Sequence, residues 1–208
     1  MKPKTRPSAE VEVEVLPRRT QIYLAASKLF VEKGFDGTSM SDIAAAVKIT
    51  KAGLYHFVES KEDLLNVIVS FGMDELHRDV IVPAREVDDP LDRLKLIIGN
   101  HLENVGRVST DAGNPMTIIS DETSGLSEAN RLVIERRKRE YFDFVRATLD
   151  ALKADGRLAT GINTTVATFS LLGMILWMAR WRRPDGPLGL EEIISQITAM
   201  ALGGLIRD

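Results

Sequence analysis

The stretch TSMSDIAAAVKITKAGLYHFVESKEDLL, residues 38–65, contains several helix-start signals close together. Thr38-Ser39 opens a helical segment, and Asp42 stands in its first turn at the spacing of a capping box. Thr50 and Ser60 are further N-cap candidates. The pattern predicts a short helix, a turn at residues 48–49, a second short helix to about Phe57, and then a longer helix.

A supporting helix precedes this stretch. Apolar residues recur with helical spacing between Arg18 and Lys33, and Gly34 follows where a helix C-terminus favours glycine. Two short helices joined by a turn, behind such a first helix, form a helix-turn-helix, whose second helix enters the major groove of DNA. We therefore predict a DNA-binding domain over residues 17–63, after a flexible tail at residues 1–16.

The remainder of the chain also has helical patterns, and no stretch argues for a strand. The fold class is therefore all-α, with an N-terminal three-helix domain joined to a larger helical domain at residues 64–208. After the helix that begins at Ser60 and runs to about Val80, the expected helices cover residues 91–108, 115–121, 127–152, 164–181 and 190–206.

Composition excludes several functions. The 208 residues include no cysteine, which excludes disulfides, thiolate catalysis and cysteine-based zinc sites. Residues 1–16 lack the apolar core of a secretory signal, and the apolar run at 166–179 is shorter than the roughly 17–25 residues of a bilayer span. We expect a cytoplasmic protein with no membrane contact.

No familiar catalytic motif is present, whether a nucleophile elbow, a phosphate-binding loop or a zinc-binding helix pair. We therefore expect no enzyme activity, no metal and no cofactor. The net charge of −3 argues mildly against nucleic acid as a partner. Residues 48–58, however, carry two lysines and one histidine and no acid.

The second short helix carries the residue types that DNA recognition needs. Ala52 and Gly53 are small enough to let the backbone approach the bases. Hydroxyl, ammonium and ring N–H groups beside them are candidate phosphate donors. These donors are Thr50, Lys51, Tyr55, His56 and Lys61, with Thr38 and Ser39 at the preceding helix start as both caps and donors. Alternatively, Tyr55 lies at the edge of the core, and the lysines are solvated.

Residues 18–65 as a block resemble the N-terminal DNA-binding domain of TetR-family repressors. The resemblance has no gaps and includes ASKLFVEKGF, the TS before the second helix, DIAAAV, and LY followed by SKEDLL. Two positions depart from the family pattern. Lys48 stands where glycine is common, and Phe57 stands where a phosphate-binding histidine is frequent, so either His56 takes over that contact or the contact is missing.

The resemblance implies that the second domain forms a homodimer and binds an inducer. The run from Val166 to Ala179 is apolar nearly all round, and such a helix must be covered on every side. Together with the last helix, at Ile193–Leu205, it would form a four-helix bundle with the same helices of a second subunit. The alternative is a core within one chain.

The segment WRRPDGPLGLEEI, from Trp181 to Ile193, resembles a turn in a subgroup of these repressors that control lipid or steroid catabolism and respond to acyl-CoA thioesters. This resemblance implies an apolar or acyl-CoA-like inducer. Arg136–Arg139 is a basic run that is either a solvated helix face or a contact for CoA phosphates. Candidate pocket residues, which are equally typical of an ordinary core, are Met73, Ile97, His101, Met116, Phe142, Phe169 and Trp177.

The resulting prediction is a ligand-responsive, DNA-binding transcriptional repressor that an inducer releases from palindromic double-stranded operator DNA. The alternative is a helical adaptor that binds another protein through the amphipathic helix at residues 127–152. The adaptor hypothesis leaves Ala52-Gly53 and the rings beside them unexplained.

Overall fold

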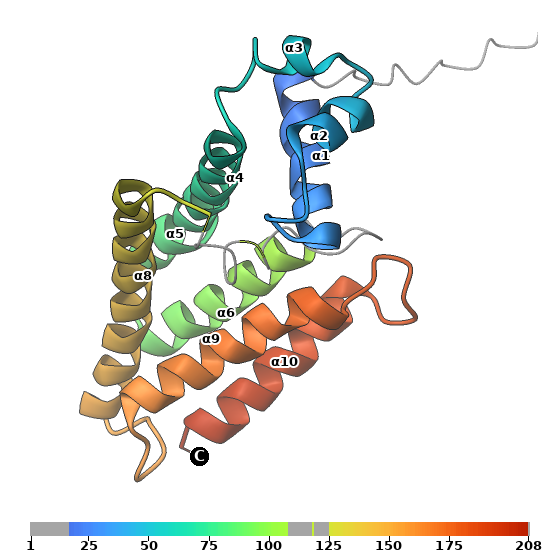
Figure 1. Cartoon of the computed structure of the whole chain (residues 1–208). Helices are drawn as coiled ribbons and strands as arrows, with labels where there is room; N and C mark the ends of the chain where they lie inside the picture. Colours follow the sequence, from blue (N-terminus) through green and yellow to red (C-terminus); the bar gives the residue numbers. More distant parts are fainter. Residues whose placement is uncertain (1–16, 108–117, 119–124, 208) are drawn as a thin grey trace, which may run out of the picture.

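A computed structural model describes residues 17–107, 118 and 125–207 of the chain. These residues are helical apart from turns and one isolated bridge between Leu158 and Ile206, so the predicted all-α class is confirmed (Figure 1). The elements are α1 (Arg18–Lys33), α2 (Met40–Ala46), α3 (Lys51–Leu54), α4 (Lys61–Leu76), the π-helix η1 (His77–Ile81), α5 (Val82–Arg85), α6 (Pro90–Arg107), α8 (Glu128–Ala154), α9 (Thr164–Trp181) and α10 (Leu190–Leu205).

Two predicted segments fall outside the described residues. They are the tail at residues 1–16 and, apart from Ile118, the short helix at 115–121. No helix of the described part of the chain has the length and apolar character needed to cross a bilayer.

The N-terminal helices α1 to α3 pack around a small apolar core at one end of the molecule (Figure 1). Ile22 and Phe30 of α1, Ile43 of α2 and Leu54 of α3 are almost fully buried in it. The third helix ends at Leu54, earlier than predicted. The amides of His56 and Phe57 bond to the carbonyls of Gly53 and Leu54, three residues back, so its end tightens into a turn.

The fourth helix extends further than predicted. It passes into η1 and α5 without leaving helical geometry, and it includes Pro83. Proline has no amide hydrogen and would clash with the carbonyl of Asp79 in a regular helix, and the wider π-turn accommodates it. The Asp79 carbonyl accepts a hydrogen bond from Asn100 Nδ2 of α6 instead, at 2.8 Å. The segment α4–η1–α5 is therefore anchored to α6.

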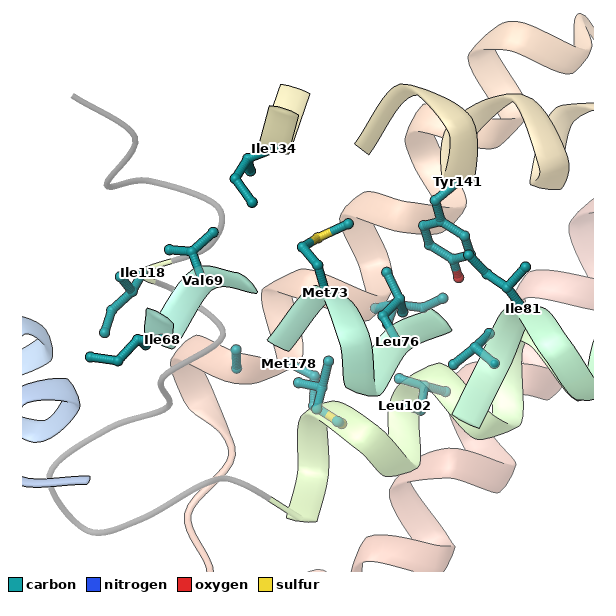
Figure 2. Packing of buried hydrophobic residues seen from close by; sticks show 14 of the residues in the cluster. Ile68, Val69, Met73, Leu76, Ile81, Leu102, Ile118, Ile134, Tyr141 and Met178 are labelled. Atoms are coloured by element: carbon teal, nitrogen blue, oxygen red, sulfur yellow. The ribbon is translucent and has the colours of Figure 1, made fainter. Parts of the chain in front are cut away.

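In the C-terminal domain α6 packs against α8, α9 and α10, and its Leu94, Ile97, Ile98 and Leu102 are fully buried. Figure 2 shows side chains of α4, α6, α8 and α9 meeting in this core. Helix α8 runs alongside α4. Two contacts hold the pair together: Glu62 Oε1 accepts from the Ser127 amide at 2.8 Å, and Arg137 Nη2 bonds to Asp74 Oδ1 at 2.6 Å.

Helix α9 is apolar nearly all round, as expected, but a single chain does not cover all of it. Leu171 and Ile175 are buried, whereas Phe169 is 65% exposed and Trp177 is 61% exposed. Val166, Trp181 and Met200 of α10 are also exposed. We call these five residues the outer apolar face.

The two domains meet where α8 begins. Gly125 lies against Phe35, which follows α1, and against Leu65 of α4. Lys61 Nζ donates to the Phe35 carbonyl oxygen at 2.8 Å and lies 4.2 Å from the centre of its ring. Helix α4 therefore has contacts in both domains, and the boundary predicted between residues 63 and 64 falls in its first turn.

Replacing Gly125 by alanine should destabilise the protein by about 1–3 kcal/mol, because the added methyl group would lie 2.5 Å from Phe35 Cε1 and 2.9 Å from Leu65 Cδ2. Gly99→Ala is the control. It lies inside α6 with no atom within 4 Å of the new methyl group, and it should stabilise by about 0.5–1 kcal/mol. Chemical denaturation measures both values. Equal effects of the two changes would contradict the packing at Gly125.

Candidate nucleic-acid interface and ligand cavity

Helix α2 begins with the capping box that its sequence predicts. Ser39 Oγ accepts from the Asp42 amide at 3.1 Å, and the Ser39 amide donates to Asp42 Oδ2 at 2.9 Å. The hydrogen bonds from Ser39, together with Lys33, lower the pKa of the Asp42 carboxyl group. Ser39 is exposed, so the box presents a hydroxyl at the positive end of α2.

The turn between α2 and α3 has a defined hydrogen-bond pattern. The amides of Lys48 and Ile49 bond to the carbonyls of Ala45 and Ala44, at 3.1 and 3.0 Å, which is a Schellman motif. Lys48 has a φ of 56°, in the left-handed region that glycine adopts with less strain. The chain therefore accommodates lysine at a position where the resemblance noted in the sequence favours glycine.

Helix α3 displays most of the predicted contact residues together at the outer end of the N-terminal domain (Figure 1). Thr50 caps it by accepting from the Gly53 amide at 3.0 Å, and the buried Leu54 anchors it. The exposed residues are Thr50, Lys51, Ala52, Tyr55 and His56, which we call the recognition face.

Three residues differ from the simplest expectation. Phe57 is half-buried against the core, whereas His56 is exposed. Lys61 is engaged with Phe35, as described above. Thr38 is only 1% exposed, and its hydroxyl lies 2.9 Å from the Gly34 carbonyl oxygen and 3.1 Å from that of Leu29. The Thr38 side chain is therefore a structural link to α1 and not part of the surface.

Sequence reasoning missed the part played by Arg18. Its Nη2 donates to the Val47 carbonyl oxygen at 2.5 Å and its Nη1 to Gln21 Oε1 at 2.9 Å. These bonds hold the start of α1 against the end of α2. A basic residue at a helix start carries no signal of such a contact, because the partner lies far away in the sequence.

A small cavity of about 50 Å³ lies between the α4–α5 segment and α8. It is lined by Met73, His77, Ile81, Arg85, Arg137 and Glu140. Met73 is thus a predicted pocket residue that does line a cavity. Ile97, His101 and Phe142 are buried among the helices, and Met116 lies outside the described residues.

Phe169 and Trp177 are largely exposed in a single chain, and their place in a ligand pocket stays a prediction. Both lie on the exposed side of α9, although the Phe169 ring touches that of Phe142 with centroids 4.5 Å apart. The hydrophobic pattern could not predict which side of α9 faces the solvent, because the helix is apolar in nearly every direction.

His101 of α6 and Tyr141 of α8 form a buried polar contact, with 3.0 Å between the tyrosine oxygen and Nδ1. Burial lowers the pKa of His101 to about 4 and raises that of Tyr141. Both groups are therefore neutral near pH 7.

Three arginines of the basic run on α8 each form an ion pair. Arg136 pairs with Glu140, Arg137 with Asp74 and Arg139 with Asp143. Only Arg137 of the run lines the cavity. Within the described parts of the chain, no group of acidic or histidine side chains has the geometry of a metal site.

The fold and the recognition face are those of a helix-turn-helix DNA-binding regulator, and comparisons with known proteins agree. Residues 22–68 match the family described as "Bacterial regulatory proteins, tetR family". Residues 87–205 match "Tetracyclin repressor-like, C-terminal domain". The chain belongs to the TetR family.

Relatives share nearly the whole length. The transcriptional repressor KstR2 of Rhodococcus jostii is 28% identical over 194 residues, covering 90% of this chain and 91% of that protein. AibR, whose structure is known with isovaleryl coenzyme A and operator DNA, is 35% identical with a TM-score of 0.77, covering 88% of this chain and 97% of that one. KstR2 of Mycobacterium tuberculosis has the same fold, with a TM-score of 0.85 over 96% of this chain and 100% of that one, at 24% identity.

These relatives confirm the predicted class, a ligand-responsive DNA-binding repressor of the TetR type. KstR2 is described as a transcriptional repressor, and AibR forms a complex with operator DNA.

Proposed function

We propose that the recognition face on α3 enters the major groove of a palindromic operator and that Ser39 at the start of α2 contacts the DNA backbone. The observation that carries this proposal is the shared exposure of Thr50, Lys51 and Ala52 at the capped start of α3 and of Tyr55 and His56 in the turn that follows it. Gly53, half-buried on the same helix, leaves the backbone accessible. Lys61 contributes through its remaining donors, since an ammonium group has three.

A repressor of this kind works in the cytoplasm, where its operator lies, and no catalytic activity is assigned to it.

Lys51→Ala should weaken binding to all duplexes about equally and should reduce the slope of log affinity against log salt by about one unit, because one phosphate contact is lost. Lys28→Ala, an exposed lysine in the middle of α1, is the control and should leave the slope unchanged. The measurement is fluorescence anisotropy with a duplex selected by the wild-type protein from a random-sequence pool. An unchanged slope with altered sequence preference would contradict the phosphate assignment of Lys51.

We further propose a homodimer that pairs through α9 and α10. The outer apolar face supports this, because a single chain leaves five large apolar side chains of α9 and α10 exposed, and exposed apolar surface of this kind marks interaction sites. A two-fold dimer also matches the symmetry of a palindromic operator.

Sedimentation at micromolar concentration should give about twice the chain mass of 23.1 kDa. Trp177→Glu should shift the species towards the monomer, because it places a charge in an apolar contact. Leu132→Glu on α8 is a matched control, since Leu132 is 56% exposed and Trp177 61%. A wild-type monomer at this concentration would rule out the dimer.

The inducer is proposed to be a ligand of the acyl-CoA type, with an apolar acyl group, bound between the α4–α5 segment and α8. The cavity beside Met73, with Arg85 and Arg137 at its rim, supports this site, and the complex of AibR with isovaleryl coenzyme A supports the chemical class. Trp177 and the exposed part of Phe169 would meet such a ligand at the subunit interface, since these side chains are 61% and 65% exposed in one chain.

Isovaleryl-CoA should change the affinity of the wild-type protein for its selected duplex. By thermodynamic linkage, the duplex must change the affinity for isovaleryl-CoA by the same factor, about 1.4 kcal/mol for each tenfold change. Calorimetric titration with and without duplex measures the coupling, and coenzyme A without an acyl group is the control ligand. Binding of isovaleryl-CoA with no effect of DNA would remove its role as inducer, and no binding would remove the ligand class.

A further inference from the structure

His101 and Tyr141 form a contact of a kind that recurs nowhere else in the described residues: a hydrogen bond between two side chains that are both buried. They are 2% and 4% exposed, and their rings meet edge to face with centroids 5.4 Å apart. The other buried polar side chains of the C-terminal domain have different partners. Thr148 and Thr168 bond to backbone carbonyls one turn earlier, and Asn104 reaches the Asp79 carboxylate.

The pair lies beside the cavity between α4 and α8. On α8, Tyr141 follows Glu140 and stands one turn after Arg137, and both of these residues line the cavity. Figure 2 shows Tyr141 beside Leu76 and Ile81, with its hydroxyl directed inward and away from α8. The buried pair therefore adjoins a cavity whose lining includes the charged Arg85, Arg137 and Glu140 and the apolar Met73 and Ile81.

The cavity is too small for an acyl chain as it stands. Its volume of about 50 Å³ corresponds to a site for one or two water molecules. Met73 on its wall has an unbranched side chain that repacks easily. The π-turn from His77 to Ile81 forms part of the same wall, and such turns interrupt the regular hydrogen bonding of a helix. The wall thus has two features that allow a ligand to enlarge the cavity.

The charge state of the pair selects the chemistry that it can bind. A neutral imidazole and a protonated phenol suit a neutral polar group and not a phosphate or carboxylate. When Nδ1 of His101 carries its proton and donates it to the tyrosine oxygen, the tyrosine O–H is available for a third group. A carbonyl oxygen is an acceptor that fits this arrangement.

We propose that Tyr141, held in place by His101, donates a hydrogen bond to the thioester carbonyl oxygen of an acyl-CoA ligand that enters between the α4–α5 segment and α8. This inference rests on the proposed inducer class. Tyr141 is then the residue that distinguishes a thioester from a CoA derivative that lacks the carbonyl oxygen. His101 is the residue that positions Tyr141. A purely structural link between α6 and α8 would give no such discrimination.

The test compares two ligands of nearly equal shape: isovaleryl-CoA and its thioether analogue, S-(3-methylbutyl)-CoA, which lacks the carbonyl oxygen. Calorimetric titration of the wild-type protein should show at least about tenfold tighter binding of the thioester. Tyr141→Phe should abolish this preference and keep the thioether affinity. Thr148→Val, which removes another buried hydroxyl from α8, is the matched control and should keep the preference.

Equal binding of both ligands by the wild type, or an undiminished preference in Tyr141→Phe, would overturn the inference and leave the inducer class intact. Binding of neither ligand would remove the inducer class and the inference with it. If Tyr141→Phe does not fold, two substitutions of His101 test the same preference for the thioester over the thioether. His101→Asn keeps an N–H donor near the position of Nδ1 and should retain part of the preference, whereas His101→Leu should lose it. If the ratio of thioester to thioether affinity were equal in these two variants, the positioning role of His101 would be contradicted.

Discussion

Helix α4 joins the two halves of this protein, because its side chains are buried in both of them. Helix α4 packs against α1 in the N-terminal domain and against α6 and α8 in the C-terminal domain. Its Leu64, Leu65 and Val69 are fully buried, and each such side chain contributes roughly 1.5–3 kcal/mol of transfer free energy. Because this apolar surface is shared, a displacement of α4 must change the packing of both domains at once.

Polar contacts then set the position of this helix along its length. Ser60 caps its start, and the Glu62 carboxylate accepts a hydrogen bond from the Ser127 amide. Further along, Arg137 pairs with Asp74, and Asn100 donates to the carbonyl of Asp79. The last of these contacts satisfies a carbonyl to which Pro83 has no amide hydrogen to donate. The recognition face and the ligand cavity lie towards opposite ends of the α4–η1–α5 segment, so these contacts connect the two sites mechanically.

The cavity and the recognition face differ in their electrostatics. The recognition face is exposed, carries lysine and histidine without a nearby acid in sequence, and suits phosphate. The region around His101 and Tyr141 is buried and neutral, and the cations of α8 near it are held in ion pairs with acidic neighbours. A ligand with an apolar acyl group and a charged carrier would match a neutral interior with charged residues beside it, which supports the proposed acyl-CoA class.

Local chemistry made much of this protein predictable from its sequence. The caps at Ser39, Thr50 and Ser60, the end of α1 at Gly34 and the length of α9 depend on residues within a few positions of one another, and the structure agrees with each prediction. The exposure of Thr50, Lys51, Tyr55 and His56 follows from the same pattern, because the buried Leu54 fixes which side of α3 faces inward.

Contacts between distant residues could not be predicted in this way. The pairing of His101 with Tyr141, the link from Arg18 to Val47 and the inward position of Thr38 each depend on how helices pack. The direction of Phe169 and Trp177 was equally undetermined, since a helix that is apolar on nearly every side gives no periodic signal of which side meets its own core. The sequence by itself therefore determined the order of the helices, most of their caps and the exposed polar residues around α3. Only the tertiary structure decided which polar groups are buried together, because that depends on packing between segments far apart in the chain.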